Sequence, residues 1–295
     1  MIVNHCFFLY NEFCGVKIMD KKVIFFDIDG TLVFNHQDIS EPVKNALRRL
    51  RDNGHYTFLC TGRNRLGVEQ FMSQGLFDGA ICSAGGYIEV ENKLIYEDAM
   101  NKEDVEKARS LFEEYGMYYN MESNYGCYQS DNFMRLFIEN FEDVHNSEVN
   151  RMIEEFHKSQ AIKPLSEYDK KPSSIQTIVY ISDDLGDVYK VKKELENVFT
   201  FLIYTTEGTA FNGELMKKGV NKGFGILKVL EYLKLPITST IGFGDSMNDL
   251  EMIETCHLGI VMANGDERLK QKADIICESV REDGIYHELI RQGLL

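Results

Sequence analysis

Several features that define common protein classes are missing from this sequence of 295 residues. No segment approaches the roughly 20 consecutive apolar residues of a membrane span. The first segment has no basic start, so a signal peptide is not expected either. No GxGxxG pattern follows the first predicted strand, which argues against a dinucleotide-binding protein.

Positive charge is also scarce, with 32 Lys and Arg against 47 Asp and Glu and a net charge of -15. This balance argues against duplex nucleic acid or an anionic membrane as the main partner. It does not exclude a phosphorylated small molecule, because a metal ion and a few cations can reverse the field inside one cleft.

The seven cysteines form no CxxC pair, and the seven histidines are scattered without ligand spacing. Cys60, Cys82 and Cys277 lie in apolar runs typical of strands, where a thiol behaves as a small hydrophobe. The sequence therefore predicts reduced core cysteines and a soluble, cytoplasmic protein.

The first 18 residues stand apart from the rest of the chain. Met19 begins the run MDKKVIFFDIDGTLV, which would be a complete domain start. We therefore expect residues 1–18 to be a dispensable extension or a misassigned start.

From residue 21 onward, strand and helix patterns alternate. Residues 23–28 (VIFFDI) are a continuous apolar run ending in Asp-Gly, as expected of a buried parallel strand. Ser40 begins a helix that runs to about Arg51. Further helices and strands are predicted at 56–60, 80–86, 222–235, 238–245, 246–256, 258–263 and 273–277. The alternation predicts an α/β fold, a doubly wound parallel sheet with helices on both faces.

The middle of the chain mixes helices and strands without glycine-tipped phosphate loops. We predict an inserted α+β domain at 100–207, with 19–99 and 208–295 forming the core. One part of the insertion gathers aromatic residues that either contact a sugar or ring or pack on their own helices: Tyr115, Tyr118, Tyr119, Tyr125 and Tyr128, followed by Arg135.

Two acidic clusters follow predicted strands. Asp27 and Asp29 stand at the carboxyl end of the first strand, where open parallel sheets bind ligands. Asp245 and Asp249 follow a later strand, one helical turn apart. Ordinary alternatives exist, because Asp29-Gly30 is also turn chemistry and Asp245 could be an N-cap. Two acidic strand ends in one parallel sheet are better explained by an oxygen-ligand site for Mg²⁺.

Two weaker signals accompany the acidic clusters. Thr61 and Gly62 end the strand at 56–60, and a hydroxyl and a backbone N–H at a helix start can hold a phosphate oxygen. Lys222 opens a helix, where a lysine opposes the helix dipole. It therefore either serves a ligand or is a solvated surface residue.

Together these motifs resemble the haloacid dehalogenase-like (HAD) superfamily, in its Cof-type, subfamily IIB phosphatases with a C2 cap. DIDGT (27–31) and GDSMNDLEMI (244–253) carry the resemblance, supported by TGR (61–63) and VNKG (220–223). It covers nearly the whole chain from Lys22 and implies a core strand order of 5-4-1-2-3, with the insertion as cap domain.

The resemblance also implies a mechanism. Asp27 would attack phosphorus and form an aspartyl-phosphate, and Asp29 would act as acid and then base. Thr61 and Gly62 would bind the phosphoryl group, and Lys222 would neutralise its charge and restrain Asp27. Asp245 would ligate Mg²⁺ with Asp27 and the backbone carbonyl of Asp29, while Asn248 and Asp249 complete or orient the ligand shell. The substrate would be a small phosphorylated metabolite, such as a sugar phosphate or a cofactor phosphate.

One departure and two other functions stay open. The family often has Asn-Gly after the third strand, where this chain has Ala84-Gly85-Gly86, so an amide contact to the ligand is missing. A phosphomutase or phosphotransferase would use the same intermediate. A non-catalytic sensor of a phosphorylated ligand would lack one of the two acids of DIDGT, and both are present.

Overall fold

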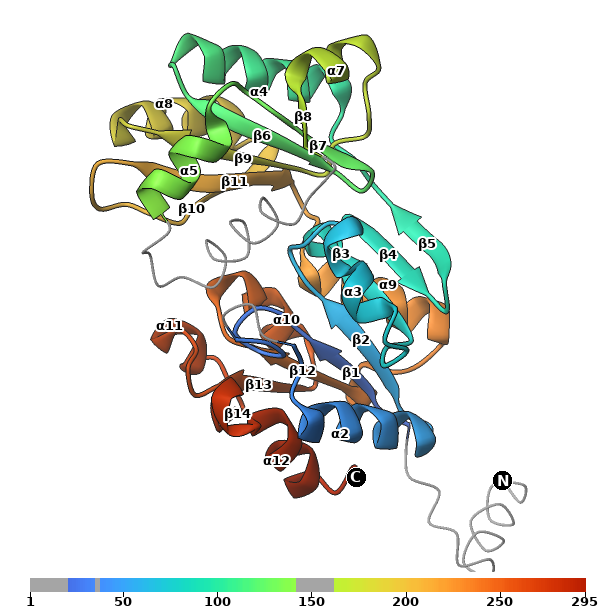
Figure 1. The fold of residues 1–295 in the computed structure, drawn as a ribbon. Helices are drawn as coiled ribbons and strands as arrows, with labels where there is room; N and C mark the ends of the chain where they lie inside the picture. The colour runs from blue at the N-terminus through green and yellow to red at the C-terminus, as the bar shows by residue number, and fades with distance from the viewer. Residues whose placement is uncertain (1–20, 35–37, 142–161) are drawn as a thin grey trace, which may run out of the picture.

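The computed structural model describes residues 21–34, 38–141 and 162–295, so the predicted extension at 1–18 lies outside the described residues. These residues form two β-sheets with helices packed on them (Figure 1). No helix within the described ranges is both long and apolar enough to cross a bilayer.

The first sheet has eight strands in the order β14-β13-β12-β1-β2-β3-β4-β5. Its strands are β1 (Val23–Phe26), β2 (Tyr56–Cys60), β3 (Gly79–Cys82), β4 (Tyr87–Val90), β5 (Lys93–Glu97), β12 (Thr240–Gly244), β13 (Leu258–Met262) and β14 (Ile275–Cys277). The predicted order 5-4-1-2-3 is present as β13-β12-β1-β2-β3, and these strands are parallel.

The sheet is not parallel throughout, which corrects the prediction. β4 and β5 are antiparallel additions at the edge. Only residues 83–86 separate β3 from β4. So short a connection can join antiparallel neighbours but not parallel ones, which need a crossover.

Helices cover both faces of this sheet, as a doubly wound fold requires. They are α2 (Glu41–Asp52), α3 (Glu69–Met72), α9 (Lys222–Leu233), α10 (Leu250–Thr255), α11 (Glu267–Lys270) and α12 (Gly284–Arg291). In β1, Ile24 and Phe26 pack in the hydrophobic cluster that contains α2 and α12, whereas Val23 and Phe25 pack with α9 and α10. Both faces of β1 are therefore covered by apolar side chains, which explains why its sequence is continuously apolar.

The second sheet has six strands in the order β10-β11-β9-β6-β7-β8. The chain segment from α4 to β11, named the insertion below, consists of α4 (Lys102–Glu114), β6 (Tyr118–Ser123), β7 (Gly126–Gln129), α5 (Phe133–Phe141), β8 (Ile162–Pro164), α7 (Leu165–Lys170), β9 (Thr177–Ser182), α8 (Leu185–Leu195), β10 (Phe199–Ile203) and β11 (Phe211–Lys217). Helices α4 and α8 pack on one face of the sheet, and α5 packs on the other. The predicted fold class, a doubly wound core with an inserted α+β part, is confirmed.

The division of the chain into domains stays a prediction. The last strand of the second sheet, β11, lies beyond residue 207 and pairs with β9 and β10. A division that follows the two sheets would therefore end the insertion at residue 217 rather than at 207. Of the clustered tyrosines, Tyr119 and Tyr128 pack in the core of the insertion, whereas Tyr125 is 62% exposed.

Candidate active site

The two predicted acidic clusters lie side by side at the carboxyl edge of the first sheet. β1 and β12 are parallel neighbours with Phe26 opposite Phe243. Asp27 follows β1 directly, and its backbone N–H donates to the Phe243 carbonyl at 2.9 Å. Asp245 follows β12 on the same edge. Parallel pairing therefore joins residues that are more than 200 positions apart in the chain.

Three buried carboxylates converge at this edge. Asp27, Asp245 and Asp249 each offer one oxygen, and these oxygens lie within 4.8 Å of one another. Gly30 makes room for Asp245, because a Cβ at Gly30 would lie 2.2 Å from Asp245 Oδ2. A buried, all-oxygen donor set of this kind fits a hard divalent cation. The cluster includes Asp249, which the sequence placed only at the margin of the metal site.

Lys222 lies between two of these carboxylates and is not a solvated surface residue. Its Nζ is 2.7 Å from Asp27 Oδ1 and 2.5 Å from Asp249 Oδ1, and its side chain is fully buried. Asn221 caps the helix at this point, because its side chain accepts a hydrogen bond from the Phe224 N–H. A buried ammonium is tolerable only when carboxylates of this kind surround it.

Asp249 also shapes the loop after β12. Its Oδ2 accepts from the N–H groups of Asp245 at 2.9 Å and Ser246 at 3.1 Å. The N-cap is Ser246, so the alternative interpretation of Asp245 as a capping residue is wrong. The Asp245 carboxylate instead accepts from the Thr31 hydroxyl at 3.4 Å. Asn248 lies nearby, with its Oδ1 3.5 Å from Lys222 Nζ.

The Asp29 carboxylate is not part of this cluster of three. It pairs with Arg63 in a bidentate arrangement, with Nε to Oδ2 at 2.9 Å and Nη2 to Oδ1 at 2.7 Å. The Arg63 side chain is only 2% exposed. Such a fork fixes the orientation of a carboxylate in addition to its charge. No role was predicted for Arg63 itself, although it belongs to the TGR motif that supports the family resemblance.

Thr61 and Gly62 follow β2, which is the strand beside β1. Thr61 is fully buried, and its Oγ1 accepts from the Arg63 N–H at 3.1 Å. Its backbone carbonyl accepts from the Ala84 N–H at 3.0 Å. Thr61 is therefore held between the loop that carries Arg63 and the loop after β3.

The loop after β3, where this chain has Ala84-Gly85-Gly86 instead of Asn-Gly, lies close against the start of α9. Ser83, Ala84 and Gly85 all have positive φ values, of 48°, 48° and 107°. A Cβ at Gly85 would lie 2.4 Å from the Asn221 carbonyl oxygen. Only glycine fits this position, and the close approach places the start of α9, including Lys222, against the site.

Burial favours the neutral thiol form of three core cysteines. Cys60 in β2 is fully buried, and burial raises the pKa of its thiol well above the usual range although Lys222 opposes the effect. Burial also raises the pKa of the Cys256 and Cys277 thiols to about 12. The predicted core role of Cys60, Cys82 and Cys277 is confirmed, since all three lie buried in strands.

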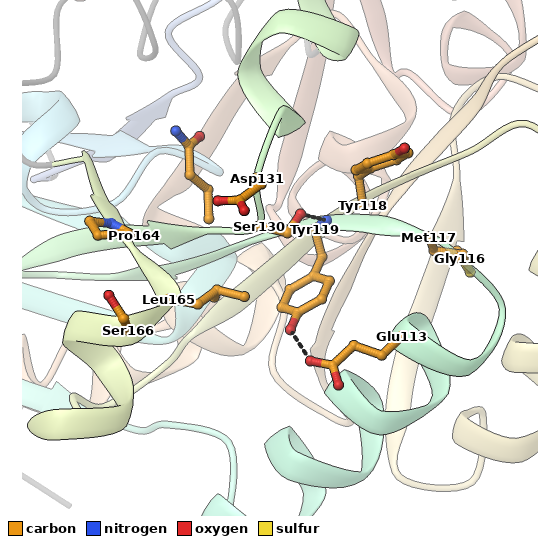
Figure 2. A pocket seen from close by; sticks show the side chains of 11 residues that line it. Glu113, Gly116, Met117, Tyr118, Tyr119, Ser130, Asp131, Pro164, Leu165 and Ser166 are labelled. Atoms are coloured by element: carbon orange, nitrogen blue, oxygen red, sulfur yellow. Dashed lines mark hydrogen bonds between the residues drawn. The ribbon is translucent and has the colours of Figure 1, made fainter.

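A separate cavity of about 620 Å³ lies in the insertion (Figure 2). It is lined by Glu113, Gly116, Met117, Tyr118, Tyr119, Gln129, Ser130, Asp131, Pro164, Leu165 and Ser166. Two of these lining residues are hydrogen-bonded to each other, since the Tyr119 hydroxyl donates to Glu113 Oε1 at 2.9 Å. None of the predicted site residues is among these lining residues, so the cavity is distinct from the acidic cluster.

Residues 24–289 match the family model of the haloacid dehalogenase-like hydrolases. The chain therefore belongs to this family, and it is an enzyme of the hydrolase class. The resemblance predicted from DIDGT and GDSMNDLEMI is confirmed.

Named relatives agree with this assignment. YkrA of Bacillus subtilis, provisionally named a phosphatase, is 26% identical over 277 residues, covering 94% of this chain and all of that protein. YitU of the same organism, named a 5-amino-6-(5-phospho-D-ribitylamino)uracil phosphatase, is 25% identical, covering 89% of this chain and 94% of its own.

Solved structures share the fold. A haloacid dehalogenase-like hydrolase from B. subtilis superimposes with a TM-score of 0.76 at 24% identity, covering 92% of this chain and 99% of that chain. A subclass IIB sugar phosphatase gives a TM-score of 0.74 at 23% identity, covering 93% of this chain and all of that chain.

Proposed function

We propose that this protein is a Mg²⁺-dependent phosphatase that hydrolyses a small phosphorylated metabolite, a sugar phosphate or a cofactor phosphate, through an aspartyl-phosphate on Asp27. One observation carries the proposal. The Lys222 ammonium lies 2.7 Å from Asp27 Oδ1 while the Asp27, Asp245 and Asp249 oxygens lie within 4.8 Å of one another. A carboxylate held between a fixed cation and an oxygen-ligand site is suited to attack a phosphoryl group.

The carboxylates would hold Mg²⁺, with Asp27, Asp245 and the backbone carbonyl of Asp29 as ligands and Asp249 and Asn248 beside them. Bound there, the metal would neutralise phosphoryl charge and orient the phosphoryl oxygens. Lys222 would supply a second positive charge and keep Asp27 from rotating. The Thr61 hydroxyl and the Gly62 N–H would contact phosphoryl oxygens from the neighbouring strand end.

Chemistry would proceed in two displacements. In the first, an Asp27 carboxylate oxygen forms a bond to phosphorus while the bond from phosphorus to the leaving oxygen breaks, and Asp29 gives its proton to that oxygen. In the second, Asp29 takes a proton from water, the water oxygen bonds to phosphorus, and the Asp27–phosphorus bond breaks. Arg63 would hold the Asp29 carboxylate in the orientation that both transfers need.

The insertion would serve as the cap that excludes water from this site and contacts the leaving group. Its attachment supports this role, since Lys217 at the end of β11 pairs with Asp98 at 2.6 Å, next to the start of the insertion. A cytoplasmic location is also proposed, because the described cysteines are thiols rather than disulfides.

The test is phosphate release from a panel of sugar, nucleotide and cofactor phosphates, with Mg²⁺ and then with EDTA. Wild type should release phosphate only with the metal, and Asp27→Asn should lose turnover on the order of 10⁴-fold or more while its circular dichroism stays that of wild type. Normal turnover in Asp27→Asn would end the nucleophile assignment. Consumption of a substrate without free phosphate, when a second hydroxyl compound is present, would instead indicate a phosphotransferase.

A further inference from the structure

Asn124 occupies an unusual position for a turn residue. It lies with Tyr125 in the short turn between β6 and β7. Turn residues usually face solvent, and Tyr125 is 62% exposed, yet Asn124 is only 1% exposed. Most buried polar side chains in proteins are hydrogen-bonded, so partners from other segments are expected around Asn124.

Three segments supply such partners. Asn124 Oδ1 accepts from the Arg65 N–H at 3.3 Å. Its Nδ2 donates to Glu97 Oε1 at 3.2 Å, at the end of β5. Its backbone N–H donates to Gln176 Oε1 at 3.2 Å, just before β9. Asn124 therefore ties the insertion to the core at two places and to its own sheet at a third.

One of the two core segments that Asn124 contacts is the loop at residues 61–67. This 61–67 loop carries Thr61 and also Arg63, whose fork holds the Asp29 carboxylate. A second contact with the insertion lies beside it, because Asn64 Nδ2 is 3.8 Å from Cys127 Sγ in β7. Arg65 itself is anchored in the core, with its Nε 2.8 Å from Glu89 Oε2. The placement of the insertion thus bears directly on the loop that orients Asp29.

We propose that Asn124 is a positioning residue that couples the placement of the insertion to the 61–67 loop and, through Arg63, to Asp29. The kinetic part of this proposal rests on the proposed function, whereas the structural part does not. When the insertion lies against the core, Asn124 fixes the Arg65 end of the loop. When the insertion moves away from the core, the Arg65 N–H loses its acceptor on Asn124. The contact between Asn64 Nδ2 and Cys127 Sγ is then also broken, which exposes the Cys127 thiol.

Three variants of the full-length protein test the coupling. Asn124→Ala removes both side-chain hydrogen bonds. Asn124→Asp keeps an oxygen for the Arg65 N–H but places a carboxylate against Glu97. Tyr125→Phe is the matched control from the same turn, since it removes only a hydroxyl 3.5 Å from Glu97 Oε2.

Two measurements are made below the melting temperature. The first is the rate of Cys127 alkylation by N-ethylmaleimide, followed by peptide mass spectrometry relative to Cys82, which is fully buried in β3. The second is kcat and KM for p-nitrophenyl phosphate with Mg²⁺. Cys127 should be alkylated about tenfold faster in Asn124→Ala than in wild type. The Arg65 N–H then loses its acceptor on Asn124, which weakens the contact between the insertion and the core. The kcat of Asn124→Ala should fall about tenfold or more with a smaller change in KM, because the loop is misplaced.

Asn124→Asp should also expose Cys127, because the introduced carboxylate repels that of Glu97. This variant tests the proposal even if Asn124→Ala does not fold. Tyr125→Phe should match wild type in both measurements. Wild-type alkylation of Cys127 in both Asn124 variants would overturn the proposal, and so would faster alkylation with an unchanged kcat. If wild type hydrolyses no phosphate ester, the proposed function fails, and the alkylation rates alone then support or overturn the positional coupling.

Discussion

Buried polar side chains differ in their pairing between the carboxyl edge of the first sheet and the sheet of the insertion. At the core edge they are charged and tightly paired, with Lys222 2.7 Å from Asp27 and Arg63 2.7 Å from Asp29. The insertion buries polar side chains of several kinds, which are four amides, two glutamates and three hydroxyl groups: Asn120, Asn124, Gln176, Asn212, Glu122, Glu214, Ser123, Thr177 and Ser182. Asn212 is fully buried, and neither of its side-chain amide atoms has a hydrogen-bond partner among the residues that the structure describes.

The difference follows from what each kind of group costs to bury. An unpaired buried charge costs several kcal/mol, so charges persist in a core only as paired networks. An unpaired amide costs about 1–3 kcal/mol, which a sheet with a large apolar core can tolerate. The core edge therefore keeps its buried charges in pairs, whereas the insertion tolerates an unpaired amide at Asn212.

The largest effect should come from breaking the charge network. Lys222→Met leaves the Asp27 and Asp249 carboxylates without their shared cation, so the free energy of unfolding should fall by about 3–5 kcal/mol. Lys228→Met is the matched control on the same helix, because Lys228 is 38% exposed and its contacts, an ion pair with Glu231 and the face of the Phe224 ring, lie at the surface. It should cost less than about 1 kcal/mol. Urea denaturation without Mg²⁺ measures both, and equal losses would mean that Lys222 is not buried between carboxylates.

A smaller effect should come from crowding the metal-site carboxylate. Gly30 and Gly54 have nearly the same φ, 85° and 84°, but a Cβ at Gly54 meets nothing within 4 Å. Alanine at either position should cost about 1–2 kcal/mol of stability from backbone strain. Gly30→Ala should also displace Asp245 and weaken Mg²⁺ binding at least about tenfold, as measured by calorimetry. Equal Mg²⁺ affinity in the two variants would show that Asp245 does not hold the metal.

The smallest change in the free energy of unfolding should come from a substitution in the insertion, and it should stabilise the protein rather than destabilise it. Asn212→Leu replaces an unsatisfied buried amide with an apolar side chain of similar size, so the protein should be as stable as wild type or more stable by about 1 kcal/mol. Asn221→Leu is the control in the core, because Asn221 caps α9, and its loss should cost about 1 kcal/mol. Thermal unfolding compares the two. A large loss in Asn212→Leu would contradict the contrast between the two sheets.

Local chemistry made much of the core predictable. A continuous apolar run identified β1, and Ser40 with a following Pro-containing turn identified the start of α2. The acids after two such strands were then expected at one edge, because parallel neighbours end together. Strands β4, β5, β7, β8 and β11 were not foreseen. β7 is only four residues long, and its sequence GCYQ shows neither strong alternation nor an apolar run.

The sequence by itself determined the family, the parallel core and the positions of Asp27, Asp29 and Asp245 after their strands, because these depend on patterns within single strands and helix starts. Only the tertiary structure decided that Arg63 holds Asp29, that Asp249 joins the triad and that Asn124 contacts the 61–67 loop. Each of these is a contact between segments distant in the chain. No periodicity or turn chemistry encodes such a contact, since it depends on how packed elements bring side chains together in space.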